Sequence, residues 1–322
     1  MKNNFSSRNS PDRARIIVRP LVCMLLLPFL AGCPDLTQVQ QFAKAADGAK
    51  TSITAIASDF KGSCDRQNLY VHLPPGPPPN PPPPQACSSG DDLTKVGNNL
   101  VAEQNVLLEY IDTLGTFAGS DASGFEKEAP TLNTSFKTAG LDTTQQAMAS
   151  AAGTLASDIT KMATAGYREK KILEILKDAD PAVTQLTTGL ADQVATQADV
   201  AALSGGAAPP GGGTSYLELL GNEQVVLNSY YQIPLAKDPN SAAGILLNVQ
   251  YQSLLGQLQA RENAAVAYRQ LMISIGQAHA KLLADAQSGD FDKASVQKIA
   301  TDLAQPISDM TNAISTLVQD AR

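Results

Sequence analysis

Residues 247–282 read LNVQYQSLLGQLQARENAAVAYRQLMISIGQAHAKL, and apolar side chains recur along this segment at steps of mostly three and four. This spacing places the apolar residues on one face of an α-helix. The seam comprises Leu247, Tyr251, Leu254, Leu258, Ala265, Tyr268, Met272, Ile275 and Leu282. The pattern predicts one very long helix over about 242–286, roughly 65 Å long at about 1.5 Å per residue.

Shorter stripes of the same kind predict helices through most of the remaining chain. The expected ranges are 36–62, 92–118, a short helix near 125–138, 141–176 with a weak point at Gly166, 181–202, 215–233, and a last helix through 296–317. There is no Trp, aromatic residues make up 5% of the chain, and β-branched runs with period two are missing, so strands are not expected. The predicted fold is all-α: an elongated antiparallel helical bundle with long helices.

Prolines and small polar residues indicate where helices should begin and end. Asp180-Pro181 resembles an N-cap followed by proline at the first helical position. Ser215 and Glu218 have the spacing of a capping box. The other expected boundaries are Pro234 and Pro239 at one helix end, Ser241 at the next cap, and Pro306 at a kink.

Two segments should separate the helical parts. Residues 64–91 contain LPPGPPPNPPPP at 73–84, which favours polyproline II and predicts a stiff connector between two helices. An exposed ligand for a peptide-recognition domain is the alternative. The Gly- and Pro-rich residues 205–214 predict a flexible linker between a first helical half, 92–204, and a second, 215–322.

The two halves carry a faint internal similarity. EQNVLLEY at 103–110 and EQVVLNSY at 223–230 share five of eight residues at an offset of 120. Two related helical halves explain this similarity, and coincidence in a small helical alphabet explains it nearly as well.

The N-terminus has the features of an export signal. Five basic residues and one acidic residue precede LVCMLLLPFL at 21–30, which is too short to cross a bilayer core that takes about 20 helical residues. Leu30-Ala31-Gly32-Cys33 follows. A basic region, a short apolar core and small residues at the cut predict that residues 1–32 are a removable signal peptide.

The segment 30–33 resembles the lipobox of bacterial lipoproteins. The resemblance implies cleavage before Cys33, acylation of that cysteine, and anchoring of 33–63, the acylated N-terminus and first helix, to a membrane. Pro34 is not the usual residue for inner-membrane retention, which favours the outer membrane. Cys23 is a poorer candidate because Val22 precedes it, and an ordinary signal followed by a chance cysteine is the remaining alternative.

Export would leave two further cysteines, Cys64 and Cys87, in an oxidising compartment. A Cys64–Cys87 disulfide would close a loop of about 24 residues and stabilise the fold by roughly 3 kcal/mol in the chain-entropy model. Two free thiols or a metal-binding pair are the alternatives.

Charge and motifs argue against several functions. Removing residues 1–32 changes the formal net charge from −7 to −11, which disfavours nucleic acid as a partner. His72 and His279 have no ligand at metal-binding spacing, and His279 falls on the apolar seam, as a packed histidine would. Glu126 and Glu128 are interpreted as solvated, and the acidic residues of the last turn as turn and capping residues rather than a calcium site: Asp285, Asp290 and Asp292.

Without a catalytic motif, cofactor site or metal site, the chain is expected not to be an enzyme. The sequence favours a membrane-tethered periplasmic lipoprotein that acts as a helical scaffold or interaction module of the cell envelope, with an envelope protein as partner. The alternative is a small-molecule-binding lipoprotein with a ligand between its helical halves. Five tyrosines motivate that alternative: Tyr216, Tyr230, Tyr231, Tyr251 and Tyr268.

Overall fold

The apolar seam of residues 247–282 forms one continuous helix. This helix, α9 (Ala242–Ser288), matches the predicted range to within two residues. Most of the seam is buried: Leu258, Ala265, Tyr268, Met272, Ile275 and Leu282. The prediction of a single long helix is therefore confirmed.

In a computed structural model of the chain, the described residues are 39–40, 42–43, 50–72, 90–118, 150–151, 154–155, 168–206, 215–288 and 293–320. They contain seven α-helices and no strand, so the predicted all-α class is confirmed. All of them belong to one compact unit, Pro34–Arg322. No helix in these ranges has both the length and the apolar character that crossing a membrane requires.

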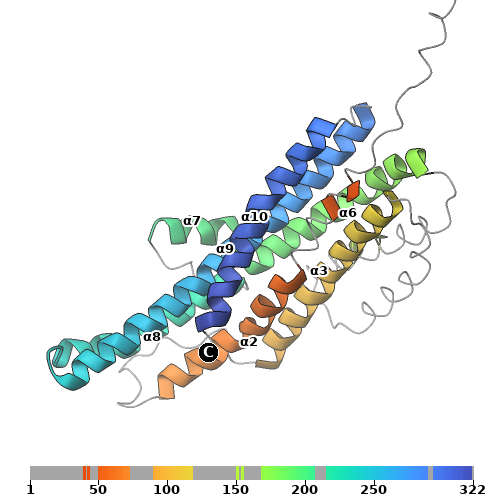
Figure 1. The fold of residues 1–322 in the computed structure, drawn as a ribbon. Helices are drawn as coiled ribbons and strands as arrows, with labels where there is room; N and C mark the ends of the chain where they lie inside the picture. The colour runs from red at the N-terminus through yellow and green to blue at the C-terminus, as the bar shows by residue number, and fades with distance from the viewer. Residues whose placement is uncertain are drawn as a thin grey trace, which may run out of the picture. The chain divides into compact units, whose positions relative to one another are not determined.

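The helices pack as a bundle around α9 (Figure 1). α9 packs against α6 (Arg168–Val194), α8 (Tyr216–Lys237) and α10 (Lys293–Asp320), and α2 (Lys50–His72) packs against α3 (Gly90–Ala118) and α8. α3 also contacts α6. α2 is therefore connected to α9 through α3 and α6 as well as through α8. The short helix α7 (Gln197–Ser204) follows α6 directly.

The prediction that the first helix ends at Gly62 was wrong. α2 does not stop at Gly62 but continues to His72, because its last turns pack against α8. Ser63 and Gln67 are buried, and the Gln67 side-chain amide donates to the Leu219 carbonyl oxygen at 3.1 Å. The predicted connector 64–91 therefore begins with helix, and its proline-rich core lies outside the described residues.

Two prolines do not mark helix boundaries as predicted: Pro181 was expected to begin a helix and Pro234 to end one. Pro181 lies inside α6 and Pro234 inside α8, which ends only at Lys237. Pro181 is exposed, while its neighbours Ala182 and Val183 are buried in the core. Packing of the apolar face outweighs the lost hydrogen bond, and the helix continues.

The break in this region lies at Thr196 instead. Its side chain accepts from the Asp199 backbone N–H while the Asp199 carboxylate accepts from the Thr196 N–H, which forms a capping box at the start of α7. The predicted caps Ser215 and Ser241 are confirmed, because each accepts a backbone hydrogen bond from the third residue after it. Ser215 also donates to Asp199 at 2.8 Å, which ties the start of α8 to α7.

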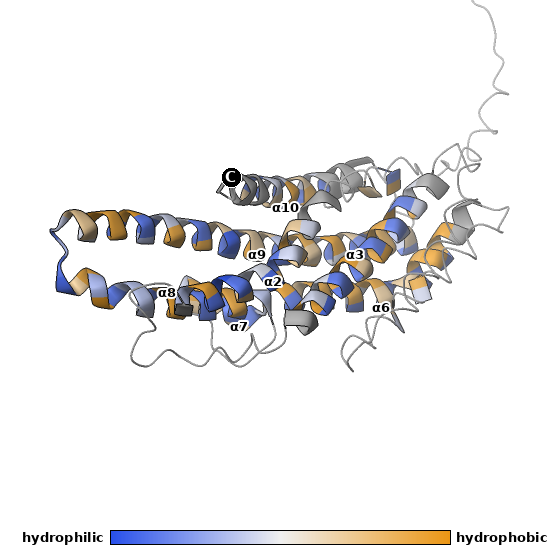
Figure 2. Ribbon diagram, turned by 90° about the horizontal axis from the view of Figure 1, so that it is seen from below, coloured by the Kyte–Doolittle hydropathy of each residue, from blue (hydrophilic) through white to orange (hydrophobic). Residues whose placement is uncertain are grey.

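Most of the buried apolar side chains among the described residues belong to two clusters. The larger one joins residues of α2, α3, α6, α8, α9 and α10. The smaller one lies between α8 and the N-terminal half of α9, with Tyr70 of α2 at its edge. Figures 1 and 2 show α8 and the first turns of α9 side by side, reaching their shared turn beyond the other labelled helices. These two segments, 216–237 and 242–258, are called the α8–α9 hairpin below.

Candidate functional site

The predicted cysteine sites fall largely outside the described residues. Cys33 and Cys87 both lie there, so acylation of Cys33 and the Cys64–Cys87 disulfide stay predictions. Cys64 lies on α2 and is buried, with the Asn68 side-chain amide 3.9 Å from its Sγ. A bond to Cys87 would therefore tie the segment before α3 to the side of α2.

Two of the other residues considered from the sequence, His72 and Asp285, lie on described helices. His72 lies on the last turn of α2, and Asp285 on α9 pairs with Lys281, with Nζ and Oδ2 3.0 Å apart. Asp290, Asp292, Glu126 and Glu128 lie outside the described residues. In the part of the chain that the structure describes, no three His, Cys, Asp or Glu side chains are grouped so that they could hold a metal ion.

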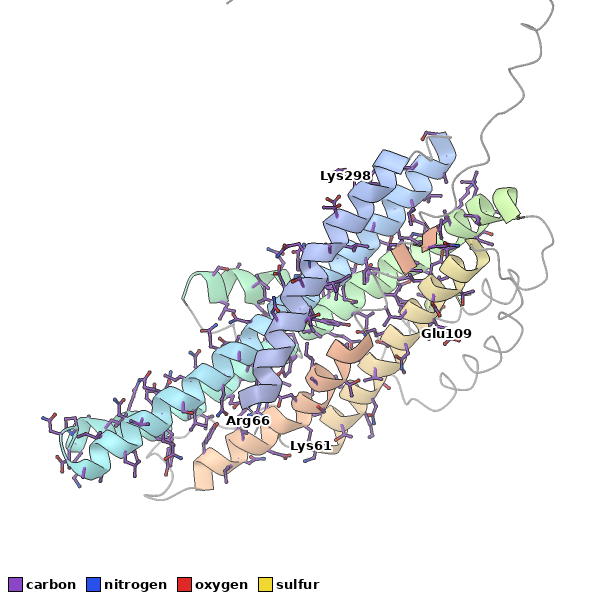
Figure 3. All side chains as sticks on the ribbon, in the orientation of Figure 1. Lys61, Arg66, Glu109 and Lys298 are labelled. Carbon is purple, nitrogen blue, oxygen red and sulfur yellow. The ribbon has the colours of Figure 1, made fainter. Side chains whose placement is uncertain are left out.

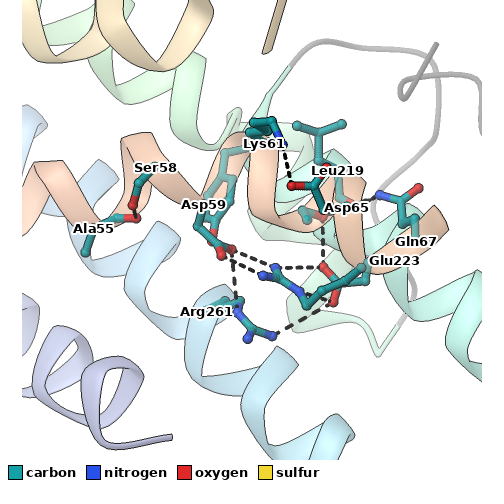
Figure 4. A network of polar contacts seen from close by, with 12 residues as sticks. Ala55, Ser58, Asp59, Lys61, Asp65, Gln67, Leu219, Glu223 and Arg261 are labelled. Carbon is teal, nitrogen blue, oxygen red and sulfur yellow. Dashed lines mark hydrogen bonds and ion pairs between the residues drawn. The ribbon is translucent and has the colours of Figure 1, made fainter. Parts of the chain in front are cut away.

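The densest polar cluster joins α2, α8 and α9 through four charged side chains (Figure 4). Arg66 of α2 donates from Nη1 and Nη2 to the two carboxylate oxygens of Asp59, at 2.7 and 2.8 Å. It also donates from Nε and Nη2 to Glu223 of α8, at 2.7 and 3.0 Å. Arg261 of α9 completes the cluster, with Nε 3.5 Å from Asp59 and Nη1 3.9 Å from Glu223.

Neutral side chains extend this cluster. Ser63 donates to the second oxygen of Glu223 at 2.8 Å, and the Tyr216 hydroxyl donates to Asp59 at 2.7 Å. These residues, together with Gln67 and the four charged ones, are called the α2–α8–α9 network. Two arginines face two carboxylates within it, so its formal charge is zero.

The electrostatics of the network keep Arg66 charged. Burial alone would lower the pKa of Arg66, but its hydrogen bonds to Asp59 and Glu223 outweigh burial and hold the pKa above its usual value. Burial and the Glu223 carboxylate raise the pKa of Tyr70 to about 12, and burial beside Asp59 raises that of Tyr216 well above its usual value. Both phenols are therefore neutral at physiological pH, and neither is poised to accept a proton.

Glu262 differs from these groups. It neighbours Arg261 on α9 and is almost fully buried, and its Oε1 has no hydrogen-bond partner among the described residues. Burial, and secondarily the Glu223 carboxylate, raise its pKa to about 7. It is the described carboxyl group with the clearest upward pKa shift.

A second buried polar cluster joins three other helices through His279 of α9. Its Nε2 lies 2.9 Å from the hydroxyl of Tyr110 on α3, and its Nδ1 lies 3.2 Å from Oδ1 of Asp180 on α6. His279 has no exposed surface. Burial lowers its pKa below 6.5, although the hydrogen bond and charge of Asp180 act in the opposite direction. The neutral imidazole therefore bridges α3 and α6 at pH 7, which confirms the interpretation of His279 as a packed histidine.

The five tyrosines that motivated a ligand site are not one group. Tyr230, Tyr231 and Tyr251 meet inside the α8–α9 hairpin, where the Tyr231 and Tyr251 rings stack with centroids 5.2 Å apart. Tyr216 belongs to the α2–α8–α9 network, and Tyr268 is buried in the larger core. Each of these tyrosines packs against neighbouring helices, and they lie in three separate places.

A groove of about 490 Å³ lies between α7, α9 and α10. Its apolar side chains are Val200 and Leu203 of α7, Val266 and Ala267 of α9, and Pro306 of α10. Polar side chains complete the lining: Ser204, Gln259, Asn263, Gln270 and Asp309. Since α7 belongs to the first predicted half and α9 and α10 to the second, the groove is shared between the halves. Among the described residues that line it, Asp309 is the ionisable side chain.

Exposed apolar side chains gather on the α8–α9 hairpin. Five of the six large apolar residues that the described surface exposes belong to it: Val225, Ile233, Ile245, Leu246 and Val249. Leu246 is the most exposed, with 71% of its surface accessible. Charge is scarce there, since Lys237 and Asp238 are the only charged residues between 224 and 260. By contrast, exposed ion pairs such as Lys61–Asp65 and Lys298–Asp302 lie along α2 and α10 (Figure 3).

Sequence reasoning missed the buried charges, although a signal was present. Arg261 falls three residues after Leu258 and four before Ala265, on the apolar seam of α9. Glu103 lies in the corresponding place on the stripe of α3, between Leu100 and Leu107, and is also buried. A charged residue at a seam position indicates a buried partner, but the sequence does not say which helix supplies it.

The chain matches no protein-family model, no curated protein and no solved structure. Its function is therefore inferred from its residues and their geometry.

Proposed function

We propose that this chain is a lipid-anchored, non-enzymatic interaction module on the periplasmic face of the cell envelope, with a protein as its partner. The observation that carries the proposal is the α8–α9 hairpin, which presents apolar side chains outward and whose residues from 224 onward include little charge. Exposed apolar patches on helices are typical of surfaces that dock other proteins.

The polar clusters support this proposal because their contacts are between helices. In the α2–α8–α9 network each arginine faces both carboxylates, and His279 spans α3 and α6. Groups held this way fix helix positions, since removing one partner of a buried pair is costly. The network lies at the base of the hairpin and so gives its apolar surface a fixed support.

The anchor rests on the resemblance of residues 30–33 to a lipobox. Lipid on Cys33 would hold the domain at a membrane, and Pro34 favours the outer one. We expect Cys33→Ser to move the protein from the membrane fraction to the soluble periplasmic fraction. A Cys33→Ser protein that stays in the membrane fraction would show that something other than lipid on this residue holds it.

The groove between α7, α9 and α10 gives the small-molecule alternative a specific place. It offers apolar surface, amides and one carboxylate, a set that suits a neutral or cationic organic molecule. The hairpin is favoured over the groove because five of its large apolar side chains are exposed and no described element covers them. A small molecule retained through purification of the lipidated protein would favour the alternative.

Site-specific photocrosslinking tests the interaction module. A photoreactive residue replaces Val249 on the hairpin or, as control, the exposed Lys177 on α6, and the full chain is expressed in its own cells. We expect a stoichiometric protein adduct from position 249 and none from position 177. Equal labelling from both positions, or no protein adduct from 249, would contradict the proposal.

A further inference from the structure

Gly256 is exposed in the middle of α9. No described helix packs against it closely enough to require a glycine there. Four other helical glycines lie where a Cβ would press on a neighbouring segment: Gly97, Gly115, Gly244 and Gly276. At Gly256 no described atom would lie within 4 Å of a Cβ. Glycine destabilises a helix interior relative to alanine, and no described neighbour of Gly256 requires it, so this position leaves room for close approach by a helix of another molecule.

Gly256 is part of a regular stripe on the outer face of α9. The stripe follows steps of four and three and comprises Ile245, Val249, Gln252, Gly256, Gln259, Asn263, Val266 and Gln270. All of these residues are exposed except Val266, which is half-buried in the groove. They are called the outer stripe below. Such spacing places these eight residues along one face of the helix.

The outer stripe contains no charged residue, although the whole chain has a formal net charge of −7. Two copies that meet through an acidic face would repel each other. Two copies that meet through the outer stripe avoid that repulsion and place amide side chains opposite one another. The stripe therefore fits a second copy of the same chain.

The exposed end of the stripe and the groove lie at equal distances from Gly256 along α9. Exposed Ile245 lies eleven residues before Gly256, and Ala267, in the apolar wall of the groove, lies eleven residues after it. At about 1.5 Å per residue, both are roughly 16 Å from Gly256. A two-fold axis at Gly256 would bring each Ile245 to the groove of the other copy and set Val249 opposite Asn263.

We infer that two copies of this chain associate through antiparallel packing of their α9 outer stripes, crossing at Gly256, with Ile245 of each copy seated in the groove of the other. The inference rests on the proposed function in part, because it names the partner of the interaction module. Glycine at the crossing lets the two helices approach closely, and the grooves take up the exposed apolar ends.

Cysteine crosslinking of the full lipidated chain tests the register. Val249→Cys in one copy should crosslink to Asn263→Cys in the other when the two variants are co-expressed. Each variant alone should crosslink no more than the wild-type chain, because equivalent positions in the two copies lie far from the crossing. Equal crosslinking of either variant with itself, or no crosslinking of the pair, would overturn the inference.

A second variant separates self-association from folding. Gly256→Leu should weaken dimerisation of the detergent-solubilised chain at least about tenfold by size-exclusion chromatography with light scattering, without lowering its thermal unfolding temperature. Gln185→Leu, at an exposed position of α6, is the matched control and should leave the dimer intact. A Gly256→Leu chain that dimerises like wild type would overturn the inference. If position 249 photocrosslinks to a different protein while the chain is monomeric, the inference fails but the proposed function stands.

Discussion

At the scale of single residues, Arg261 and His279 occupy the buried seam of α9 and each is held by partners from other helices. Arg261 faces Asp59 of α2 and Glu223 of α8, whereas His279 contacts Tyr110 of α3. Buried polar groups lose their contacts with water, so each has to meet a partner at a defined place. These two residues therefore fix which helices meet along α9.

His279 should make the fold sensitive to acid. Burial lowers its pKa below 6.5, so as the pH falls the unfolded chain binds the proton before the folded chain does. Its contribution to stability is present above pH 6.5 and is lost as the pH falls through the lower pKa of the folded state. We expect His279→Gln to flatten this dependence, measured as the free energy of unfolding in urea at pH 7.5 and pH 5. An unchanged difference between the two pH values would show that His279 is not responsible.

Glu262 should make the fold less stable as the pH rises, which is the opposite of the pH dependence expected from His279. Its pKa of about 7 in the folded chain is above its usual 4.5, so its contribution is present below pH 4.5 and is lost as the pH rises through 7. We expect Glu262→Gln to stabilise the protein at pH 8 by about 1–2 kcal/mol, a range that allows for solvent screening, and to have little effect at pH 5. Denaturant unfolding at both pH values measures this.

The exposed Asp178 on α6 supplies the control for Glu262. Asp178→Asn should change the free energy of unfolding by less than about 0.5 kcal/mol at either pH, because the side chain lies in water. If Glu262→Gln is no more stable than the wild type at pH 8, the carboxyl group is better solvated than its burial indicates.

At the scale of elements, apolar periodicity was enough to predict α3 and α9 within two residues of their ends. Both helices have long stripes, and burial of a stripe is what stabilises a helix in a protein. The local cap signals at Ser215 and Ser241 were equally dependable, because a cap depends on only a few neighbouring residues.

Boundaries that depend on other helices were not predictable in this way. α2 continues past Gly62 because Ser63, Gln67 and Tyr70 meet α8, a segment some 150 residues later in the chain. Pro181 stays inside α6 because the flanking apolar residues pack against the core. In each case a long-range contact outweighs the local signal, and the sequence alone does not reveal that contact.

The candidate sites show the same difference between local signals, which the sequence reveals, and long-range contacts, which it does not. The sequence indicated that His279 lies on a packed face, but not that Tyr110 and Asp180 meet it from α3 and α6. It likewise showed the scarcity of charge in the hairpin, but not that its apolar residues face outward. Which face of a helix is covered depends on its neighbours, and only the fold supplies them.

At the scale of the whole unit, the α2–α8–α9 network lies between the two apolar clusters. The hairpin cluster is small, with five buried residues, and α8 carries both Glu223 and four of those five. A small cluster supplies little stability alone, so the hairpin depends on its connection to the larger core. The network is the polar part of that connection.

Loss of Glu223 should therefore uncouple the hairpin from the larger core. Glu223→Gln leaves Arg66 and Arg261 with one carboxylate between them, which should lower the free energy of unfolding by about 3–5 kcal/mol. We expect hydrogen exchange to accelerate more in residues 226–255 than in residues 258–282, where wild type protects both. Lys61→Gln, which breaks an exposed pair with Asp65, should change stability by less than about 1 kcal/mol and leave the exchange pattern intact. Uniform acceleration of both segments in Glu223→Gln would mean that the two clusters unfold as one unit, and that the network supports the whole core rather than the base of the hairpin.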